Sequence, residues 1–362
     1  MTEAETPLTL PGSDELEVTL FGPGYGESVV LHTGQGRWVI VDSCIDNSGY
    51  PRALGYLESI GVNPSRAVDL IVATHWHDDH IRGMSRLVEV CERAAFSCAA
   101  ALLTKEFLTV VGVWSGSRVT SDGSGLREIR DVFTTLGSRA KKPTFALANR
   151  LIHSQGECQI WSLSPGDADF SNFLRSVGAL SPDAGQTKTR IPSVSPNEVG
   201  IVVWINVRDA NLLLGSDSEK GAWLEILQNR QPIGQASVFK VPHHGSADAH
   251  EERVWKEMLV TEPFAVLTPW WRGGRALPTR QDVRRILAQT SNAFATSNAR
   301  LTVQSAKRRD GMVDRTIRES NVTIRRQPIL AGAVRLRHVL GSRSKWKVEM
   351  FGPACHLHDY AA

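Results

Sequence analysis

The segment that most constrains this chain is a histidine-rich loop that directly follows an apolar strand. Residues 68–74 (VDLIVAT) are predicted to form a buried strand, and the sequence then reads His75-Trp76-His77-Asp78-Asp79-His80. Neutral imidazole nitrogens and carboxylate oxygens are the ligands that zinc and similar divalent cations prefer. Because so dense a cluster is costly to desolvate without a cation, the loop predicts a metal site. We expect His75 and His77 to face one ion, and Asp79 and His80 a second.

The rest of the chain alternates predicted strands and helices, which is typical of an α/β fold. Short strands are expected within 16–42 and helices at 51–60 and 84–95. Further strands are expected at 199–207, 211–217, 236–242, 264–269, 332–339 and 346–351, and helices at 219–228, 251–260 and 280–289. We expect one domain over 1–362. Residues 97–195, where the signals weaken, predict an insertion or cap, and 272–362 form the basic C-terminal part that completes the fold.

Composition places the chain among globular proteins, because 41% of its residues are hydrophobic and 22% are charged. The first 30 residues carry acids and prolines where an export signal has a basic start and an apolar run. The sequence has no apolar run of about 18 residues, the length a membrane span needs. We therefore expect a cytoplasmic protein without a membrane partner. The five scattered cysteines, including Cys44, are expected to be buried thiols.

Positive charge is concentrated near the C-terminus, although the net charge of the chain is only +3. From Arg272 onward there are 18 Lys and Arg residues against six Asp and Glu residues. This balance favours an anionic partner such as nucleic acid, unless acids elsewhere in the fold offset it. Trp270 and Trp271 lie beside Arg272, so we expect Trp270 and Arg272 to contact substrate, with core packing as the alternative for both tryptophans.

The histidine loop resembles the H-x-H-x-D-H motif of the metallo-β-lactamase superfamily. That resemblance implies an αββα sandwich and assigns further residues. Asp42, at the end of RWVIVD, matches the aspartate that supports the metal loop from behind. Asp217, in LLLGSDS, matches the carboxylate that bridges two metal ions. The pair His243-His244, in KVPHHGS, matches the last histidine motif.

Within the superfamily, the spacing is most similar to the hydrolase domain of ComEC-type competence proteins. The similarity spans roughly 16–339 and includes GPGYGES, Ser164-Pro165, NEVGIVV, GSD at 215–217 and KVPHHGS at 240–246. The chain departs from that pattern in two places. Asn197 stands where the family has a third metal-binding histidine, since His153 comes too early, and Leu277-Pro278 replaces a His-Pro pair.

The resemblance implies hydrolysis by a metal-activated water at a centre of two divalent ions, with zinc expected and manganese as the alternative. Asp79 is expected to hold the water and accept its proton. The residue spacing does not show which of the adjacent residues His243 and His244 binds metal. We expect His243 to bind metal and His244 to contact substrate or donate a proton.

A phosphodiester substrate, as for a nuclease, is favoured by the resemblance and by the basic C-terminal part. Two alternatives stay open. One is an esterase, thioesterase or lactonase acting on a small molecule, because the same centre serves several substrates. The other is a non-catalytic scaffold or effector subunit that binds a protein partner. The sequence does not indicate the oligomeric state.

Overall fold

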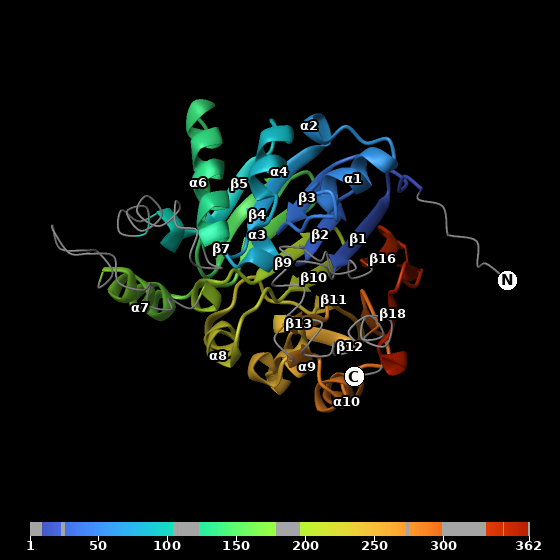
Figure 1. The fold of residues 1–362 in the computed structure, drawn as a ribbon. Helices are drawn as coiled ribbons and strands as arrows, with labels where there is room; N and C mark the ends of the chain where they lie inside the picture. The colour runs from blue at the N-terminus through green and yellow to red at the C-terminus, as the bar shows by residue number, and fades with distance from the viewer. Residues whose placement is uncertain are drawn as a thin grey trace, which may run out of the picture.

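The fold is α/β, with two mixed β-sheets and helices on their outer faces (Figure 1). The computed structural model describes residues 9–22, 26–103, 107, 123–178, 196–272, 275–298, 331–342 and 344–360. Each sheet has eight strands in the described residues, and a short two-stranded hairpin lies apart from both. This arrangement confirms the α/β fold class predicted from the sequence.

The first sheet has the order β17-β16-β1-β2-β3-β4-β5-β6. It is antiparallel from β17 to β3 and parallel from β3 to β6. Its strands are β1 (Glu15–Gly22), β2 (Ser28–His32), β3 (Trp38–Val41), β4 (Val68–Ala73), β5 (Ala95–Ala99), β6 (Thr144–Ala146), β16 (Gly332–Val339) and β17 (Lys347–Phe351).

The second sheet has the order β18-β15-β12-β11-β10-β9-β8-β7 and is parallel from β10 to β15. Its strands are β7 (Arg150–Gln155), β8 (Cys158–Ser162), β9 (Val203–Val207), β10 (Ala210–Leu214), β11 (Ala236–Lys240), β12 (Leu259–Leu267), β15 (Ala293–Ala295) and β18 (Cys355–His356). The separate hairpin consists of β13 (Trp270–Arg272) and β14 (Arg275–Leu277).

Helices flank both sheets. The α-helices are α1 (Arg52–Ser59), α2 (Pro64–Ala67), α3 (Asp78–Ile81), α4 (Met84–Val90), α6 (Gly123–Ser138), α7 (Asp167–Gly178), α8 (Lys220–Asn229), α9 (Glu252–Glu257) and α10 (Arg280–Leu287). Short 3-10 turns are η1 (Ala100–Leu103), η2 (Pro196–Val199), η3 (His243–Gly245), η4 (Ala247–Ala249) and η5 (Leu357–Asp359). The helix predicted at 251–260 is shorter than expected, because β12 already begins at Leu259.

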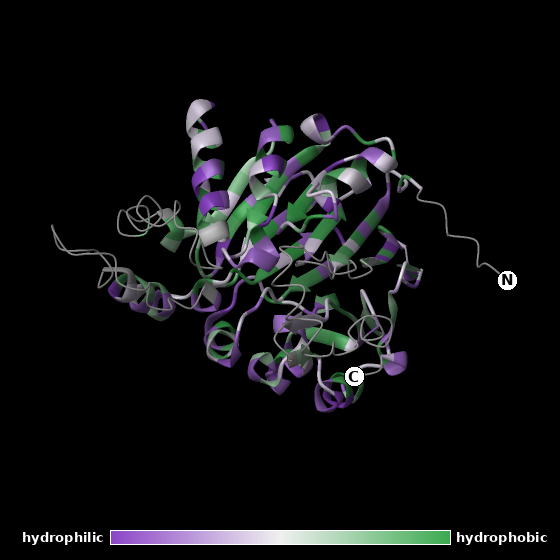
Figure 2. Ribbon diagram, viewed as in Figure 1, coloured by the Kyte–Doolittle hydropathy of each residue, from purple (hydrophilic) through white to green (hydrophobic). Residues whose placement is uncertain are grey.

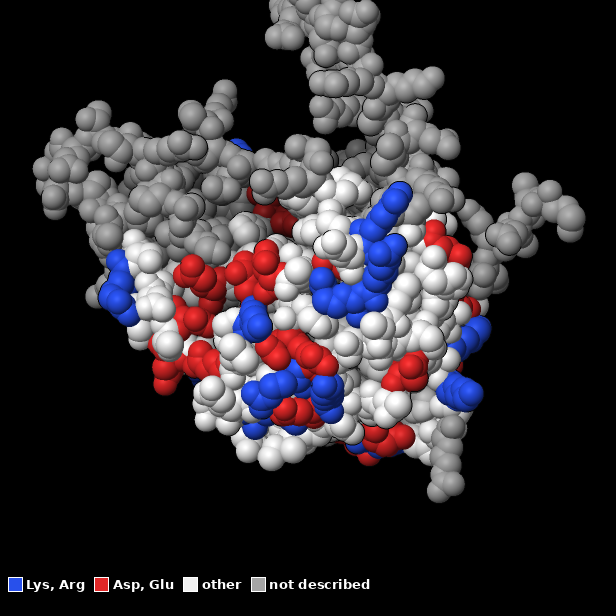
Figure 3. All heavy atoms as spheres, turned by 90° about the horizontal axis from the view of Figure 1, so that it is seen from below, with Lys and Arg blue, Asp and Glu red and all other residues white. Residues whose placement is uncertain are grey.

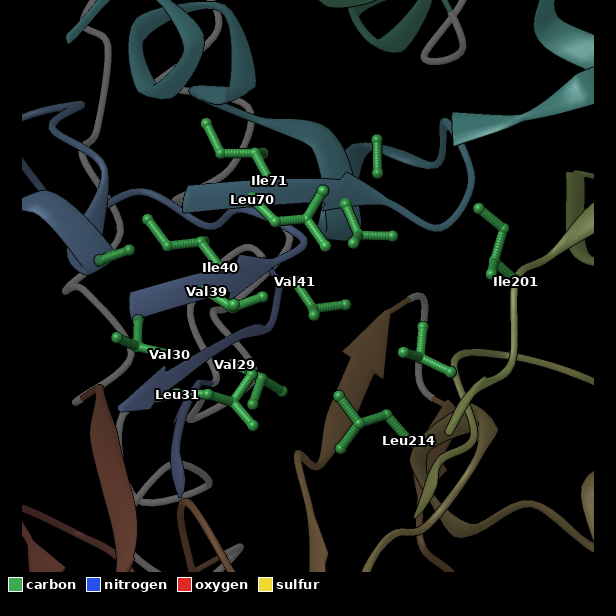
Figure 4. Packing of buried hydrophobic residues seen from close by; sticks show 14 of the residues in the cluster. Val29, Val30, Leu31, Val39, Ile40, Val41, Leu70, Ile71, Ile201 and Leu214 are labelled. Carbon is green, nitrogen blue, oxygen red and sulfur yellow. The ribbon is translucent and has the colours of Figure 1, made fainter. Parts of the chain in front are cut away.

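The period of two along the strands divides the apolar side chains between two cores. On β10, Leu214 joins the larger core, and its neighbour Leu213 joins a smaller core against the helices of the second sheet. Figure 4 shows Leu214 and Ile201 across from Val41 of the first sheet, so the larger core fills the space between the sheets. In the smaller core, Trp223 of α8 packs with side chains of the sheet. Figure 2 accordingly shows apolar strands and more polar helices.

Two chain segments of the sequence analysis contribute strands to both sheets. The described part of 97–195 supplies the end of β5 and β6 to the first sheet and β7 and β8 to the second. The described part of 272–362 supplies β16 and β17 to the first sheet and β15 and β18 to the second. Among the described residues, no helix has both the length and the apolar character that crossing a membrane demands.

Candidate metal centre

The predicted metal-binding residues meet where strands of the two sheets end. From the first sheet, Asp42 follows β3 and the histidine loop follows β4. From the second sheet, Asp217 follows β10 and His244 follows β11. Because residues just beyond neighbouring strand ends lie close together, loops from both halves of the chain converge here.

Among the described residues, three groups of side chains have ligand atoms within 4.8 Å of one another, and two of these groups share Asp217. One of the two contains Asp79, His80, Asp217 and His244, and the other contains His75, His77 and Asp217, while the third group is Glu27, Asp42 and His80. Asp217 belongs to both, as expected of a carboxylate that bridges two ions. The structure thus brings His75 and His77 together in one group and Asp79 and His80 in another.

Hydrogen bonds fix two of the imidazole rings in the tautomer that metal binding needs. His80 Nδ1 lies 2.7 Å from Asp42 Oδ2, and His244 Nδ1 lies 2.9 Å from the Thr268 carbonyl oxygen. Both oxygens can only accept, so each Nδ1 carries a hydrogen and each Nε2 is left to face the centre. There His80 Nε2 lies 3.3 Å from Asp217 Oδ1, and His244 Nε2 lies 3.3 Å from Asp79 Oδ2.

The third ring is oriented by the same aspartate through a hydroxyl group. Asp42 accepts hydrogen bonds from Thr74 N and Thr74 Oγ1, each at 2.8 Å. Since the single hydroxyl hydrogen of Thr74 is donated to Asp42, Thr74 Oγ1 must accept from His75 Nδ1, 3.0 Å away. His75 Nε2 then points toward His77 Nδ1 at 3.2 Å. Asp42 therefore sets the tautomers of both His75 and His80.

The electrostatics of this region favour positive charge. Burial acts to lower the pKa of His80, but the carboxylates of Asp217, Glu27 and Asp42 outweigh it and raise that pKa well above 6.5. Burial acts to raise the pKa of Asp217, yet the charges of His80 and His244 hold it well below its usual range. The pKa of Asp79 is lowered against the effect of burial by the hydrogen bond from His244.

These residues fit a bound divalent cation. His80 Nε2 and Asp217 Oδ1 are buried and form an ion pair at 3.3 Å, but within the described part of the chain neither atom makes a hydrogen bond of good geometry. Both atoms are metal-ligand types, and buried polar atoms of this kind are stabilised by a well-placed partner. A cation between them would satisfy both, and it would supply the positive charge that the carboxylates favour.

The structure places His244, and not His243 as expected, among the candidate metal ligands. His244 belongs to a group that could hold a metal ion, and His243 belongs to none among the described residues. The reason is the backbone of the turn after β11, where φ is 48° at His243, 54° at His244 and 82° at Gly245. Three successive left-handed residues reverse the direction of the side chains, which residue counting cannot predict.

Of the other predicted site residues, Trp270 is placed beside the centre by a ring contact. Asn197 is buried in η2, and its Oδ1 has no hydrogen-bond partner among the described residues. The Trp270 ring stacks on the His244 ring with centroids 6.3 Å apart, so the two are brought together. Arg272 ends β13, and its side chain lies outside the described residues. Cys44 is buried, and burial raises its thiol pKa to about 12, so it is unreactive.

Sequence reasoning missed two buried charged residues behind the centre. The Glu27 carboxylate forms an ion pair with the Lys240 ammonium, and both side chains are buried. Glu27 N also donates to the Asp79 carbonyl oxygen at 2.8 Å. The signal for Glu27 was available in the GPGYGES turn, where a Cβ on Gly26 would lie 1.8 Å from Asp79 O. Only glycine permits so close an approach to the metal loop.

Comparison with known proteins finds a family model that is similar to one part of this chain. Residues 21–102 match the family model of the metallo-beta-lactamase superfamily, and no curated protein matches the chain. Among solved structures, Zn(2+)-bound PqqB from Methylobacterium extorquens is 12% identical with a TM-score of 0.32, over 59% of this chain and 58% of that one. The CmlA beta-hydroxylase E377D mutant is 16% identical with a TM-score of 0.35, over 64% of this chain and 36% of the other.

MEM-A1, a subclass B3 metallo-beta-lactamase isolated from a soil metagenome library, is 13% identical with a TM-score of 0.35, over 65% of this chain and 79% of that one. This chain therefore spans less than two thirds of PqqB and of CmlA. Because these similarities are distant, the description of the fold rests on the sheets and helices of this chain itself. The family-model match includes β2 to β5, Asp42 and the whole histidine loop. Residues 21–102 of this chain are therefore similar to the metallo-beta-lactamase superfamily.

Proposed function

We propose that this protein is a hydrolase that depends on two divalent metal ions and acts on phosphodiesters. The observation that carries the proposal is the tautomer arrangement, in which His75, His80 and His244 each have Nδ1 engaged and Nε2 directed at the shared centre. One ion would be held by His75, His77 and Asp217, and the other by Asp79, His80, Asp217 and His244. The mixture of imidazole and carboxylate ligands favours zinc, with manganese as the alternative.

Two such ions lower the pKa of a bound water and polarise the oxygen of the substrate when they are bound. The chain's own residues supply the remaining functions. Asp79 is the most accessible carboxylate of its group, with 22% of its side chain exposed against 3% for Asp217. Its position allows it to orient the attacking water and to accept a proton from it. Trp270 covers one face of His244 and limits the access of solvent there.

The phosphodiester preference rests on the positive charge near the site. Arg285, on α10, donates to the Gly245 carbonyl oxygen at 2.7 Å and pairs with Asp282 at 2.6 Å, which fixes a guanidinium beside the His243–Gly245 turn. A fixed arginine suits the phosphate oxygens of an anionic substrate. Arg335 and Arg337, two other basic residues of the C-terminal part, do not contribute, since they are buried in the first sheet and paired with Glu349 and Glu17. On the face seen in Figure 3, acidic and basic side chains are interspersed.

The test is hydrolysis by the purified protein, loaded with zinc or with manganese. Substrates are bis(p-nitrophenyl) phosphate, single- and double-stranded DNA, RNA and a p-nitrophenyl ester. Asp79→Ala removes the proposed proton acceptor, and Asp248→Ala, at an exposed position in η4 after the histidine turn, is its matched control. We expect cleavage of phosphodiesters that is lost in Asp79→Ala and kept in Asp248→Ala. Cleavage of the ester alone would overturn the phosphodiester proposal, and no cleavage by a metal-loaded protein would favour a scaffold.

A further inference from the structure

A buried lysine lies directly behind the candidate metal centre. Lys240 ends β11, is 2% exposed, and places its Nζ 3.8 Å from Asp217 Oδ1. That oxygen also lies 3.3 Å from His80 Nε2, and the Lys240 ammonium forms an ion pair with it at a distance too long for a hydrogen bond. In a buried region, an ammonium and a carboxylate at this distance attract each other strongly.

Two other oxygens hold the Lys240 ammonium in place. Lys240 Nζ donates to the Ser216 carbonyl oxygen at 2.8 Å and forms an ion pair with Glu27. Glu27 precedes β2 in the first sheet, and Lys240 belongs to the second, so the pair joins the two sheets. Glu27 is 2% exposed, and its backbone is tied to the metal loop by the hydrogen bond to Asp79 O. Water therefore cannot take over the role of Glu27 cheaply.

The position of the lysine has consequences for metal binding. A metal ion and an ammonium group are alternative cations for the same carboxylate oxygen. With Glu27 present, the lysine charge is compensated and Asp217 Oδ1 remains available. Besides Glu27, Asp217 is the only carboxylate among the described residues that forms an ion pair with the Lys240 ammonium, at 3.8 Å. Without Glu27, the ammonium would therefore be drawn toward Asp217.

We propose that Glu27 is a positioning residue that keeps the Lys240 ammonium away from Asp217, so that Asp217 stays free to bind metal. The inference rests on the proposed metal-dependent function and adds the group that regulates the affinity of its centre. A different role, in which the pair only clamps the sheets together, would also be lost on mutation. The two roles differ in what a second mutation does, because removing the lysine removes the competing cation but cannot restore a clamp.

The experiment measures metal affinity rather than turnover. Wild type, Glu27→Gln and the double variant E27Q/K240M are titrated with zinc against a chromophoric chelator, and cobalt(II) spectra report the ligand environment. Thermal unfolding verifies that each variant is folded. Glu349→Gln is the matched control, because Glu349 is also a buried partner of a basic residue, Arg335, but lies in the hairpin of β16 and β17, outside the groups of potential metal ligands.

We expect Glu27→Gln to weaken zinc binding by about tenfold or more and to alter the cobalt spectrum. E27Q/K240M should regain most of that affinity, and Glu349→Gln should bind as wild type does. If Glu27→Gln does not fold, the double variant decides, since the proposal predicts near wild-type affinity for it and a clamp predicts weak binding. Wild-type affinity in folded Glu27→Gln, or a double variant that binds weakly, would overturn the proposal alone. A wild-type protein that binds no divalent metal would overturn the proposed function as well.

Discussion

Replacing Asp42 by asparagine should reverse the tautomers of two metal-binding histidines at once. Asp42 adopts a φ of 60°, a conformation that asparagine tolerates as well as aspartate does, so the backbone should not change. The amide oxygen must remain on Thr74 N, which can only donate. The amide nitrogen then replaces Oδ2 and faces Thr74 Oγ1 and His80 Nδ1 as a donor. The Thr74 hydroxyl would in turn donate to His75.

Each of the two imidazoles would then carry its hydrogen on Nε2, the nitrogen that faces the centre. Loss of such supporting contacts costs about 10–100-fold in metal affinity. Because both ligand groups are affected, we expect about 100-fold, or close to 3 kcal/mol of binding free energy. Chelator competition with zinc measures the affinity. Thermal unfolding in the presence of a chelator verifies the fold.

The matched control for this prediction is Asp69→Asn on β4, which changes an ion pair with Arg37 far from the histidine rings. It should leave zinc affinity unchanged. The reasoning about tautomers would be refuted if folded Asp42→Asn bound zinc as tightly as wild type does. It would also be refuted if Asp69→Asn caused an equal loss.

Three further results follow from the geometry. Metal binding should release protons and strengthen as pH rises above 6.5, because carboxylates raise the pKa of His80 and His244 in the metal-free protein. Calorimetry in buffers of different ionisation enthalpy measures the number of protons released. Gly26→Ala should destabilise the protein by about 3 kcal/mol, because the added Cβ would contact Asp79 O. Gly36→Ala should cost only about 1 kcal/mol, because φ is also positive there but the space is open. Urea unfolding measures both changes. Burial, with Glu225 and Glu198, raises the pKa of Asp169 to about 6, so the folded protein holds this proton more tightly and loses stability as pH rises from 4 to 6. Asp169→Asn should therefore be more stable than wild type at pH 7, by about 1 kcal/mol after allowance for the exposure of this side chain, and should unfold at a higher temperature. At pH 4 it should show no such gain.

Much of the site could be predicted from the sequence because its ligands directly follow strands. His75, His77, Asp79, His80 and Asp217 are brought together as the motif spacing indicates. Strand ends are readable from apolar runs, so residues just beyond them can be placed without knowing the full topology. Asp42 was expected to support the metal loop because of the resemblance to the superfamily, and it bonds to Thr74 and His80 in the structure.

Other features depend on geometry that residue patterns do not contain. The choice of His244 over His243 follows from left-handed backbone angles in a three-residue turn. The partnership of Glu27 and Lys240 joins positions from different sheets, and neither residue belongs to a local ligand pattern. The strands β6 and β7 were hard to recognise because β6 has three residues and β7 alternates weakly between buried and exposed positions.

The most direct test of the central claim is the number of divalent ions that the chain binds, measured by native mass spectrometry after loading with zinc. Asp217→Asn removes the carboxylate shared by both ligand groups, and Asp209→Asn, on the exposed turn between β9 and β10, is its control. We predict two ions for wild type and for Asp209→Asn, and fewer for Asp217→Asn. A wild-type protein that remains free of metal, or an Asp217→Asn variant with both ions bound, would contradict the account.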